Sequence, residues 1–124
     1  MPEQLTTPQA YLYRYERECP QQPYLHQPSD DGTRVFTWGD CAAQARRLAS
    51  ALRSMGFEPG DRIAIFSRNC AEWIIAALAL MVGGYISVPI YSSASESTTR
   101  HTLEDSGSRA VFVGKLDHPE EQDA

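Results

Sequence analysis

The sequence predicts an α/β fold in which a parallel sheet is flanked by helices. The first observation is the stretch from Pro59 to Tyr91, which reads as strand, helix, strand. Ile63–Phe66 is a short apolar run without polar alternation, as expected of a strand covered on both faces. The second observation is that a helical crossover joins the two strands, which favours parallel pairing. With a third apolar run near the C-terminus, we expect strands near 63–67, 85–88 and 110–113 and helices near 38–55, 69–82 and 96–106.

Each boundary of this central unit carries a local signal. Pro59-Gly60-Asp61 is a turn, because proline fixes φ and glycine tolerates positive φ. Asn69, with Glu72 three residues later, predicts an N-cap and a capping-box partner for the central helix. Gly83-Gly84 predicts its C-terminal end, and Pro89 closes the strand that follows.

The central helix is apolar at every position from 73 to 82. Such a run of ten residues is too short to cross a bilayer, which needs about eighteen or more apolar residues. A helix that is apolar all round is instead packed between other layers of a folded domain. We therefore predict no transmembrane segment and expect burial of Trp73, Ile74, Leu78 and Met81.

The helix expected over 38–55 begins with a recognisable cap. Thr37 is the predicted cap, and Asp40 lies near the positive end of the helix dipole. Arg46-Arg47 could form a phosphate-binding patch, but a solvated polar face is the favoured interpretation. Apolar residues recur at helical spacing and predict a buried stripe made of Cys41, Ala45, Leu48, Leu52 and Met55.

The N-terminal stretch is less decisive. Thr7-Pro8 predicts a helix start, and a helix from there would run to about Glu18. The alternation of Tyr11, Tyr13 and Tyr15 is also compatible with a strand, although the charged residues between and after them favour the helix. The tyrosines are interpreted as a packing face, because the chain lacks the basic groove that accompanies base stacking.

The segment Gln21–Gly32 is expected to be a loop around a short strand at 24–26, followed by a brief strand at Val35-Phe36. Asp30 and Asp31 could serve as a metal or phosphoacceptor site. Because no apolar strand feeds into this acidic pair and Gly32 follows it, a turn is the favoured interpretation.

A Ser/Thr-rich run, Ser92–Thr99, follows the central unit. Phosphate-binding loops use backbone amides exposed by glycines, usually with a lysine, and this run contains neither. We therefore interpret it as a loop in which Ser95 caps the last helix, which would end at Gly107.

Composition sets the class of protein. The 124 residues fit a single domain, 1–124, with expected poorly ordered tails at 1–6 and 116–124. A net charge of −5 argues against a nucleic-acid partner. The N-terminus shows no signal-peptide pattern, and three cysteines without metal-ligand spacing fit a reducing compartment, so we expect a cytoplasmic location.

Of the three cysteines, Cys70 would lie in the first turn of the central helix, where the dipole favours a thiolate.

The order of these segments resembles the start of the adenylate-forming enzymes, the superfamily of acyl-CoA synthetases, luciferases and peptide-synthetase adenylation domains. The resemblance runs from about Thr7 to Lys115 and includes Pro89-Ile90-Tyr91-Ser92-Ser93, which is similar to the long-chain fatty acyl-CoA synthetases. The other matching pieces are Phe36-Thr37-Trp38, 56–65, 69–73, Gly83-Gly84-Tyr85 and Asp105-Ser106-Gly107.

The resemblance implies a two-step, AMP-forming ligase reaction. ATP and a carboxylic acid, here a long-chain fatty acid, give an acyl-adenylate, and CoA then displaces AMP, with Mg²⁺ stabilising phosphate charge. The family's lysine-containing Gly/Ser/Thr-rich loop and its later catalytic motifs do not occur here, and the only lysine is Lys115. We therefore expect an N-terminal fragment of such a ligase that is inactive alone, with no catalytic, cofactor-binding or metal residue assigned. Its partner would be the remainder of the ligase, and apolar surface left exposed would favour self-association.

The alternative is a self-sufficient, non-catalytic α/β module that binds a nucleotide, CoA or a protein partner. In open α/β sheets, ligands bind beyond the carboxyl ends of the strands. At that edge this chain would offer Ser67-Arg68-Asn69, Tyr91-Ser92-Ser93 and Gly114-Lys115.

Overall fold

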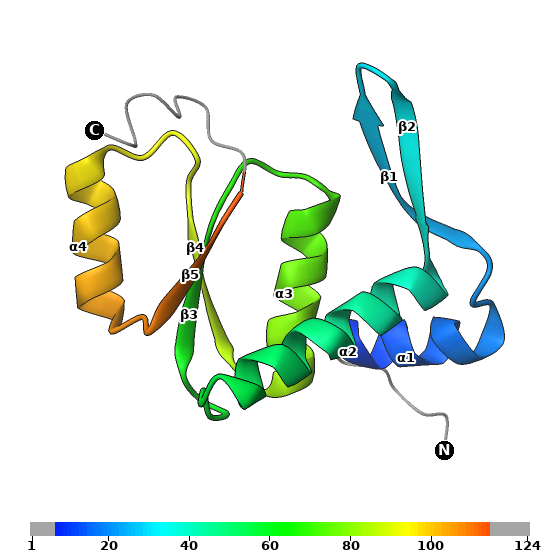
Figure 1. Cartoon of the computed structure of the whole chain (residues 1–124), viewed down its shortest axis with the longest axis horizontal. Helices are drawn as coiled ribbons and strands as arrows, with labels where there is room; N and C mark the ends of the chain where they lie inside the picture. The colour runs from blue at the N-terminus through cyan, green and yellow to red at the C-terminus, as the bar shows by residue number, and fades with distance from the viewer. Residues whose placement is uncertain (1–6, 115–124) are drawn as a thin grey trace.

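The computed structural model describes residues 7–114, whose helices and strands form a parallel sheet with its helices and a separate β-hairpin (Figure 1). This confirms the predicted fold class. The sheet contains three strands, β4, β3 and β5, and the hairpin contains β1 and β2. In chain order the elements are α1 (Pro8–Glu18), β1 (Pro23–Ser29), β2 (Gly32–Thr37), α2 (Trp38–Ser54), β3 (Arg62–Phe66), α3 (Ala71–Gly83), β4 (Ile86–Ile90), α4 (Glu96–Ser106) and β5 (Ala110–Val113).

The sheet has the strand order β4-β3-β5, and both neighbours of β3 run parallel to it, as predicted. Helices cover both of its faces (Figure 1). Alternate side chains of β3 point to opposite faces, so Ile63 and Ile65 pack with α2 and α3. Ala64 and Phe66 face the other way, towards α4. The central strand is therefore buried on both sides, which explains its lack of polar alternation.

The prediction that Pro89 ends a strand at 85–88 is wrong. The strand instead covers Ile86–Ile90, with Pro89 inside it opposite Ile65. The N–H of Ile86 donates to the carbonyl of Asp61, so by alternation the backbone of Pro89 faces the outer edge of the sheet. A missing N–H is tolerated there, because β3 does not need it.

Helix α3 ends as predicted, with Gly84 in the left-handed conformation at φ 79°. Leu78 is buried as expected, but Trp73, Ile74 and Met81 are only half-buried. The buried positions of α3 combine large residues, Ile75, Leu78 and Leu80, with small ones that let α2 and β3 approach the helix; the small ones are Ala71, Ala76, Ala77 and Ala79.

Helix α1 forms as predicted, so the strand alternative for its tyrosines is wrong, and Thr7 accepts a hydrogen bond from the N–H of Ala10. The strands expected at 24–26 and at Val35-Phe36 are confirmed but are longer than predicted, so the expectation that the rest of Gln21–Gly32 is a loop is wrong. Residues 23–29 pair antiparallel with 32–37 in a hairpin that stands away from the parallel sheet (Figure 1). Its two-residue turn, Asp30-Asp31, leads into Gly32 at φ 126°, a conformation that favours glycine.

An aromatic stack holds the hairpin base against the helices. The rings of Tyr24 and Trp38 are stacked with centroids 3.8 Å apart, and Tyr15 of α1 lies 4.7 Å from Trp38. The stack joins α1, β1 and the first residue of α2, and offset or tilted ring pairs of this kind add stability beyond their buried area.

Helix α2 confirms the Thr37–Asp40 capping box and the burial of Cys41, Ala45 and Leu52. Leu48 of the predicted stripe is half-buried, and Met55 is not buried, because it is the C-terminal cap and is 71% exposed.

The expected solvated face of α2 also needs a correction. The guanidinium of Arg46 donates to both carboxylate oxygens of Glu16 in α1 and lies over the ring of Tyr13, so it joins two helices. Arg47 remains exposed, as predicted. Within residues 7–114, no helix is both long and apolar enough to cross a membrane.

Candidate ligand site at the strand ends

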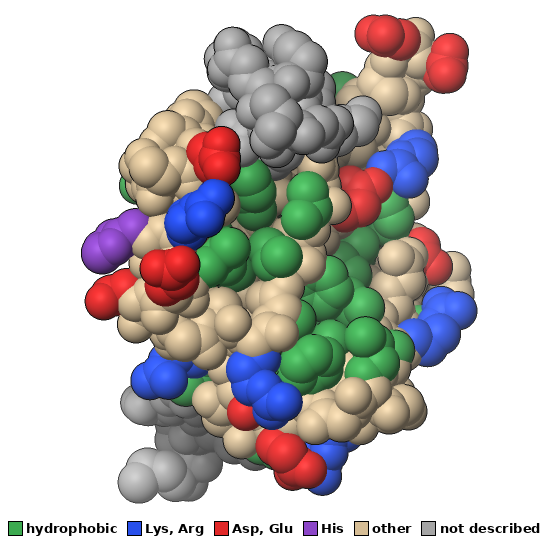
Figure 2. Space-filling model, turned by 60° about the vertical axis from the view of Figure 1, so that its left-hand side comes forward, with side chains coloured by type: hydrophobic (Ala, Val, Ile, Leu, Met, Phe, Trp, Pro, Cys, Tyr) green, Lys and Arg blue, Asp and Glu red, His purple; other side chains and the backbone are tan. Residues whose placement is uncertain are grey.

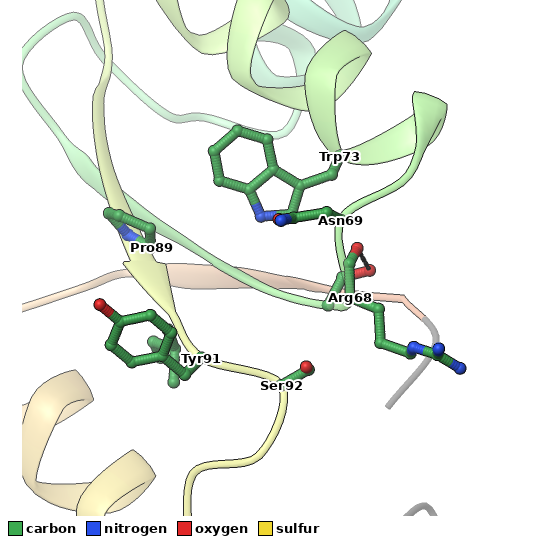
Figure 3. A pocket seen from close by; sticks show the side chains of 8 residues that line it. Arg68, Asn69, Trp73, Pro89, Tyr91 and Ser92 are labelled. Atoms are coloured by element: carbon green, nitrogen blue, oxygen red, sulfur yellow. Dashed lines mark hydrogen bonds between the residues drawn. The ribbon is translucent and has the colours of Figure 1, made fainter. Parts of the chain in front are cut away.

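A pocket of about 540 Å³ opens where β3 and β4 end (Figure 3). The indole of Trp73 and the ring of Tyr91 lie on opposite sides of Pro89, and the side chain of Arg68 extends away from the two rings. The pocket combines aromatic, hydroxyl and cationic groups, and it is lined by Ser67, Arg68, Asn69, Trp73, Pro89, Ile90, Tyr91 and Ser92.

The ends of β3 and β5 approach each other closely beside this pocket. Ser67 is buried and its hydroxyl donates to the carbonyl of Arg68 at 2.9 Å, which fixes the turn after β3. The N–H of Gly114 donates to the carbonyl of Phe66 at 3.0 Å. A Cβ on Gly114 would lie 2.3 Å from the Ser67 hydroxyl, so only glycine permits this approach.

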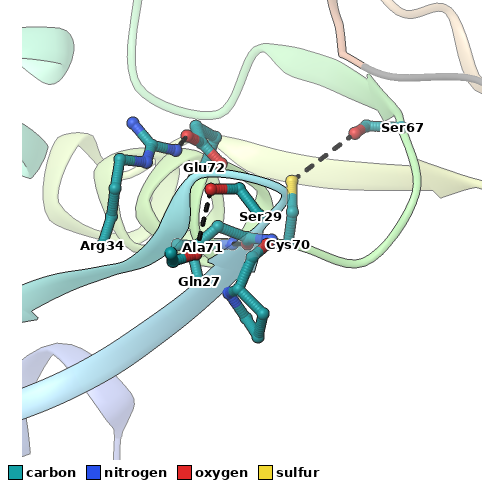
Figure 4. Close-up of polar contacts among 9 residues, drawn as sticks. Gln27, Ser29, Arg34, Ser67, Cys70, Ala71 and Glu72 are labelled. Atoms are coloured by element: carbon teal, nitrogen blue, oxygen red, sulfur yellow. Dashed lines mark hydrogen bonds and ion pairs between the residues drawn. The ribbon is translucent and has the colours of Figure 1, made fainter.

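The start of α3 differs from the prediction, because Asn69 does not cap it. Cys70 occupies the cap position and makes no side-chain capping bond, while Asn69 turns to the pocket. The missing acceptor comes from the hairpin, where the side-chain oxygen of Gln27 accepts from the N–H of Ala71 at 2.8 Å (Figure 4). A cap 44 residues away in the chain thus replaces a local one.

Glu72 also turns to the hairpin instead of completing a capping box. Its carboxylate accepts a hydrogen bond from Arg34 of β2 (Figure 4). Partial burial opposes ionisation of Glu72, but the hydrogen bonds from Arg34 and from the backbone outweigh it and lower its pKa. The pair therefore holds an ionised carboxylate in the first turn of α3, where the helix dipole also favours it.

The structure brings together most of the residues predicted at the strand ends. The triplet Ser67-Arg68-Asn69 and the pair Tyr91-Ser92 line one pocket. Ser93 is exposed and does not line it, and Gly114 lines a neighbouring pocket of about 290 Å³ that shares Ser67 and Trp73. Lys115 lies outside the described residues.

Trp73 is the pocket residue that sequence reasoning missed. It was assigned to the core because it begins an unbroken apolar run. The available signal was its place in the first turn of a helix that follows a strand end, since that turn borders the ligand edge of an open α/β sheet.

The other sequence hypotheses about chemistry take structural roles. Asp30 and Asp31 form the hairpin turn, and residues 7–114 hold no cluster of three or more His, Cys, Asp or Glu side chains able to bind a metal. Ser95 caps α4 as predicted, accepting from the N–H of Thr98 at 3.1 Å. Cys70 lies one residue before the first turn in which it was expected.

The pocket is chemically suited to a planar or anionic group and not to a magnesium ion. Trp73 and Tyr91 offer two aromatic surfaces, and Arg68 offers a cationic donor. None of the described lining residues is a carboxylate, the oxygen ligand that Mg²⁺ prefers.

Residues 12–124 match the sequence profile described as "AMP-binding enzyme". The chain belongs to the AMP-binding enzyme family. The strand-end pocket is thus part of an AMP-binding enzyme fold, and the resemblance inferred from the sequence is confirmed at this level.

Among curated AMP-binding enzymes, a long-chain-fatty-acid–CoA ligase of Mycobacterium bovis is 32% identical over 109 residues, which cover 88% of this chain and 18% of the relative. The long chain acyl-CoA synthetase 2 of Arabidopsis thaliana is 30% identical over 118 residues, which cover 91% of this chain and 18% of the relative. The chain therefore spans less than a fifth of the length of these relatives.

Solved structures support the same family fold. The N-terminal subdomain of NpsA from Klebsiella oxytoca is 27% identical, with a TM-score of 0.75 over 88% of this chain and 28% of that chain. A fatty acid AMP ligase from Legionella pneumophila has a TM-score of 0.78 at 21% identity, over 85% of this chain and 19% of that chain. The second likeness concerns the fold alone.

Proposed function

We propose that this chain forms the amino-terminal part of an ATP-dependent, AMP-forming acyl-CoA synthetase that activates a long-chain fatty acid. The complete ligase would use ATP, Mg²⁺ and CoA and pass through an acyl-adenylate. The observation that carries the proposal is the similarity to long-chain fatty acid ligases from both bacteria and plants across about nine-tenths of this chain.

The role of this chain in the reaction would be to build and support one wall of the site. The strand-end pocket presents Arg68, Trp73 and Tyr91 at the end of a sheet whose central strand is buried on both sides. Because the described lining residues include one cation and no carboxylate, they do not fit Mg²⁺, and we assign no catalytic step to them. Neutralisation of phosphate charge by donors already in place is the main requirement of acyl-adenylate formation, so we propose that the chain alone is inactive.

The test compares the purified 124-residue chain with the longer polypeptide encoded by the same reading frame. We expect pyrophosphate exchange with ATP, Mg²⁺ and fatty acids only for the longer polypeptide, with preference for long chains. Exchange by the short chain above a protein-free blank would contradict its inactivity. A longer polypeptide that prefers acetate or an amino acid would contradict the long-chain assignment.

The alternative function is that of a non-catalytic module binding a nucleotide, CoA or a protein partner at the same pocket. The observation in its favour is that the pocket forms within this chain and is lined by a cation, Arg68, and two aromatic residues, Trp73 and Tyr91. Titration calorimetry with ATP and with CoA tests it, using Arg68→Gln and, as a matched control on the exposed side of α2, Arg53→Gln. Binding that only Arg68→Gln weakens would favour this function, and no heat with either ligand would contradict nucleotide or CoA binding.

A further inference from the structure

The start of α3 differs by one residue from the start that its own sequence favours. Asn69 and Glu72 have the spacing of a local capping box, in which Asn69 would cap a helix that begins at Cys70. The helix instead begins at Ala71, and Cys70 has extended backbone angles, φ −162° and ψ 174°. A contact from outside the helix must therefore favour the later start.

Two residues of the hairpin occupy the groups that the local capping box needs. In a helix that starts one residue earlier, the Asn69 side chain would accept from the N–H of Ala71 or Glu72. The N–H of Ala71 donates instead to the side-chain oxygen of Gln27 at 2.8 Å (Figure 4). The carboxylate of Glu72, the other half of the box, accepts from Arg34. The hairpin contacts and the local capping box thus compete for the same groups.

Gln27 and Arg34 are placed to act together. They are directly opposed in the antiparallel hairpin, so their side chains lie on one face and reach consecutive residues of α3. Cavities of about 470 and 420 Å³ flank this contact, and both are lined by Gln27, Pro28 and Cys70. Figure 2 shows the outer part of the hairpin projecting from the surface, with acidic side chains at its tip. Among the described residues, few other side chains connect this part of the hairpin to α3.

The choice of helix start decides where the Asn69 side chain lies. With the later start, Asn69 is exposed and lines the strand-end pocket together with Arg68 and Trp73 (Figure 3). Its amide both donates and accepts hydrogen bonds, so it offers a ligand two kinds of polar contact. As a helix cap, the same side chain would turn back to the backbone of α3 and leave the pocket.

We propose that Gln27 and Arg34 are positioning residues of the strand-end pocket. By holding the later start of α3, they keep Asn69 at the pocket. When the two hairpin contacts are lost, α3 gains one residue at its N-terminus, and Asn69 and Glu72 form their own capping box. Detachment of the hairpin therefore changes the pocket while α3 stays folded. This role is independent of the ligase function proposed above.

A double-mutant cycle between Gln27 and Asn69 tests the exchange of caps. Asn69→Ala alone should change the equilibrium constant of unfolding by less than about twofold, because Asn69 does not cap α3 in the wild-type chain. In the Gln27→Ala background, the same change should raise that constant by roughly 2- to 30-fold, the usual effect of losing an N-cap. Urea denaturation followed by circular dichroism measures both effects.

Thr33→Ala supplies the matched control for this cycle. Thr33 is exposed and precedes Arg34 in β2, so its side chain lies on the opposite face of the hairpin. In the Thr33→Ala background, Asn69→Ala should have as little effect as in the wild-type chain.

Nuclear magnetic resonance follows the helix start directly. The Cα chemical shift of Cys70 should be that of an extended residue in the wild-type chain and should move to a helical value in Gln27→Ala/Arg34→Gln. A nuclear Overhauser contact between the Asn69 Cβ protons and the N–H of Glu72 should appear in the same variant. Adding Asn69→Ala should return the Cys70 shift towards the extended value. A purely structural role of the hairpin contacts would not produce this reversal.

Several results would overturn the proposal. They are an equal effect of Asn69→Ala in the wild-type and Gln27→Ala backgrounds, an extended Cys70 shift in the folded Gln27→Ala/Arg34→Gln variant, and a helical shift that persists after Asn69→Ala. If that double variant does not fold, Gln27→Ala and Arg34→Gln alone supply the same readouts. Unfolding of all three would show that Asn69 does not replace the hairpin contacts and would reject the exchange.

Discussion

Gln27 of the hairpin accepts a hydrogen bond from the N–H of Ala71, the first residue of α3, at 2.8 Å. This contact fixes the hairpin to the helix that borders the candidate site. It also satisfies a backbone donor that neither Cys70 nor Asn69 caps.

The first prediction follows from this cap. We expect Gln27→Ala to lower the free energy of unfolding by about 0.5–2 kcal/mol, the usual effect of losing a capping side chain. Urea denaturation followed by circular dichroism measures it, with the exposed Gln21→Ala as the control. Equal loss of stability in both variants would show that the cap contributes nothing.

The second prediction concerns Gly83 at the end of α3. A Cβ there would lie 2.5 Å from the ring of Tyr85, which is buried and donates through its hydroxyl to the carbonyl of Phe57. Alanine normally improves a helix, but here the ring cannot move without losing this hydrogen bond. We expect Gly83→Ala to destabilise the chain by about 1–3 kcal/mol, as overpacking does.

A double-mutant cycle supplies the control for Gly83. Combining Gly83→Ala with Tyr85→Ala removes the clash. The double variant should therefore lose less free energy of unfolding than the sum of the losses in the two single variants. Strict additivity, or a gain in stability from Gly83→Ala alone, would argue against the steric explanation.

The third prediction concerns the ion pair between Glu16 and Arg46. The hydrogen bond and charge of Arg46 lower the pKa of Glu16, although partial burial opposes this. Because the folded-state pKa is depressed, the pair contributes stability above the unfolded-state value of about 4.3, and this is lost as pH falls through the folded-state value. Exposure of Arg46 limits the effect to about 1 kcal/mol or less.

Denaturation of wild-type chain and Glu16→Gln at several pH values measures this contribution. The difference in stability between the two proteins should shrink as pH falls from 6 to about 3. A difference that stays constant over this range would show that the charge of Glu16 is not responsible. High salt should reduce the difference near neutral pH, because salt screens exposed charges.

The fourth prediction concerns the three cysteines. Burial, with a smaller effect from the charge of Asp40, raises the pKa of Cys41 to about 11, and its side chain is 0% exposed. In the native chain at neutral pH, we expect Cys41 to resist alkylation while the half-buried Cys19 and Cys70 react. Cys41 should become reactive only when the chain unfolds.

Mass spectrometry of time-resolved alkylation follows each thiol separately. Labelling of Cys41 as fast as Cys19 would contradict its burial. A rate at Cys70 close to that of a free cysteine would indicate an inert packing residue, whereas a much faster rate would indicate an activated thiolate.

The fold could be predicted from sequence wherever its signals were local. Thr37 and Asp40 cap α2 across three residues, Ser95 caps α4 across three, and Gly84 ends α3 by its own conformation. The apolar run within β3 likewise predicts burial on both faces of the sheet. Such elements depend on neighbours within a single turn, so the sequence alone contains the information.

The errors arose where the deciding partner is distant in the chain. The start of α3 depends on Gln27, which lies 44 residues away. Pro89 fits inside β4 because its backbone faces away from β3. This direction depends on which strand lies beside β4 and in what register, and the sequence of β4 alone does not contain that information. Arg46 was assigned to solvent because its partner, Glu16, belongs to another helix.

The candidate site was predictable in part for a topological reason. The carboxyl ends of parallel strands meet at one edge of a sheet, and this rule alone predicts that Ser67-Arg68-Asn69 lie beside Tyr91-Ser92, as the pocket confirms. Trp73 was missed because the apolar run that it begins indicates the core, although its place in the first helical turn after a strand end was an available signal.

The placement of the two tryptophans gives the chain a pair of separate optical reporters. Trp38 is stacked on Tyr24 at the base of the hairpin, and Trp73 lines the strand-end pocket. With Trp73→Phe, the emission that remains reports whether the hairpin stays attached during unfolding. With Trp38→Phe, it reports solvent access to the pocket, so the two regions can be followed independently in one small protein.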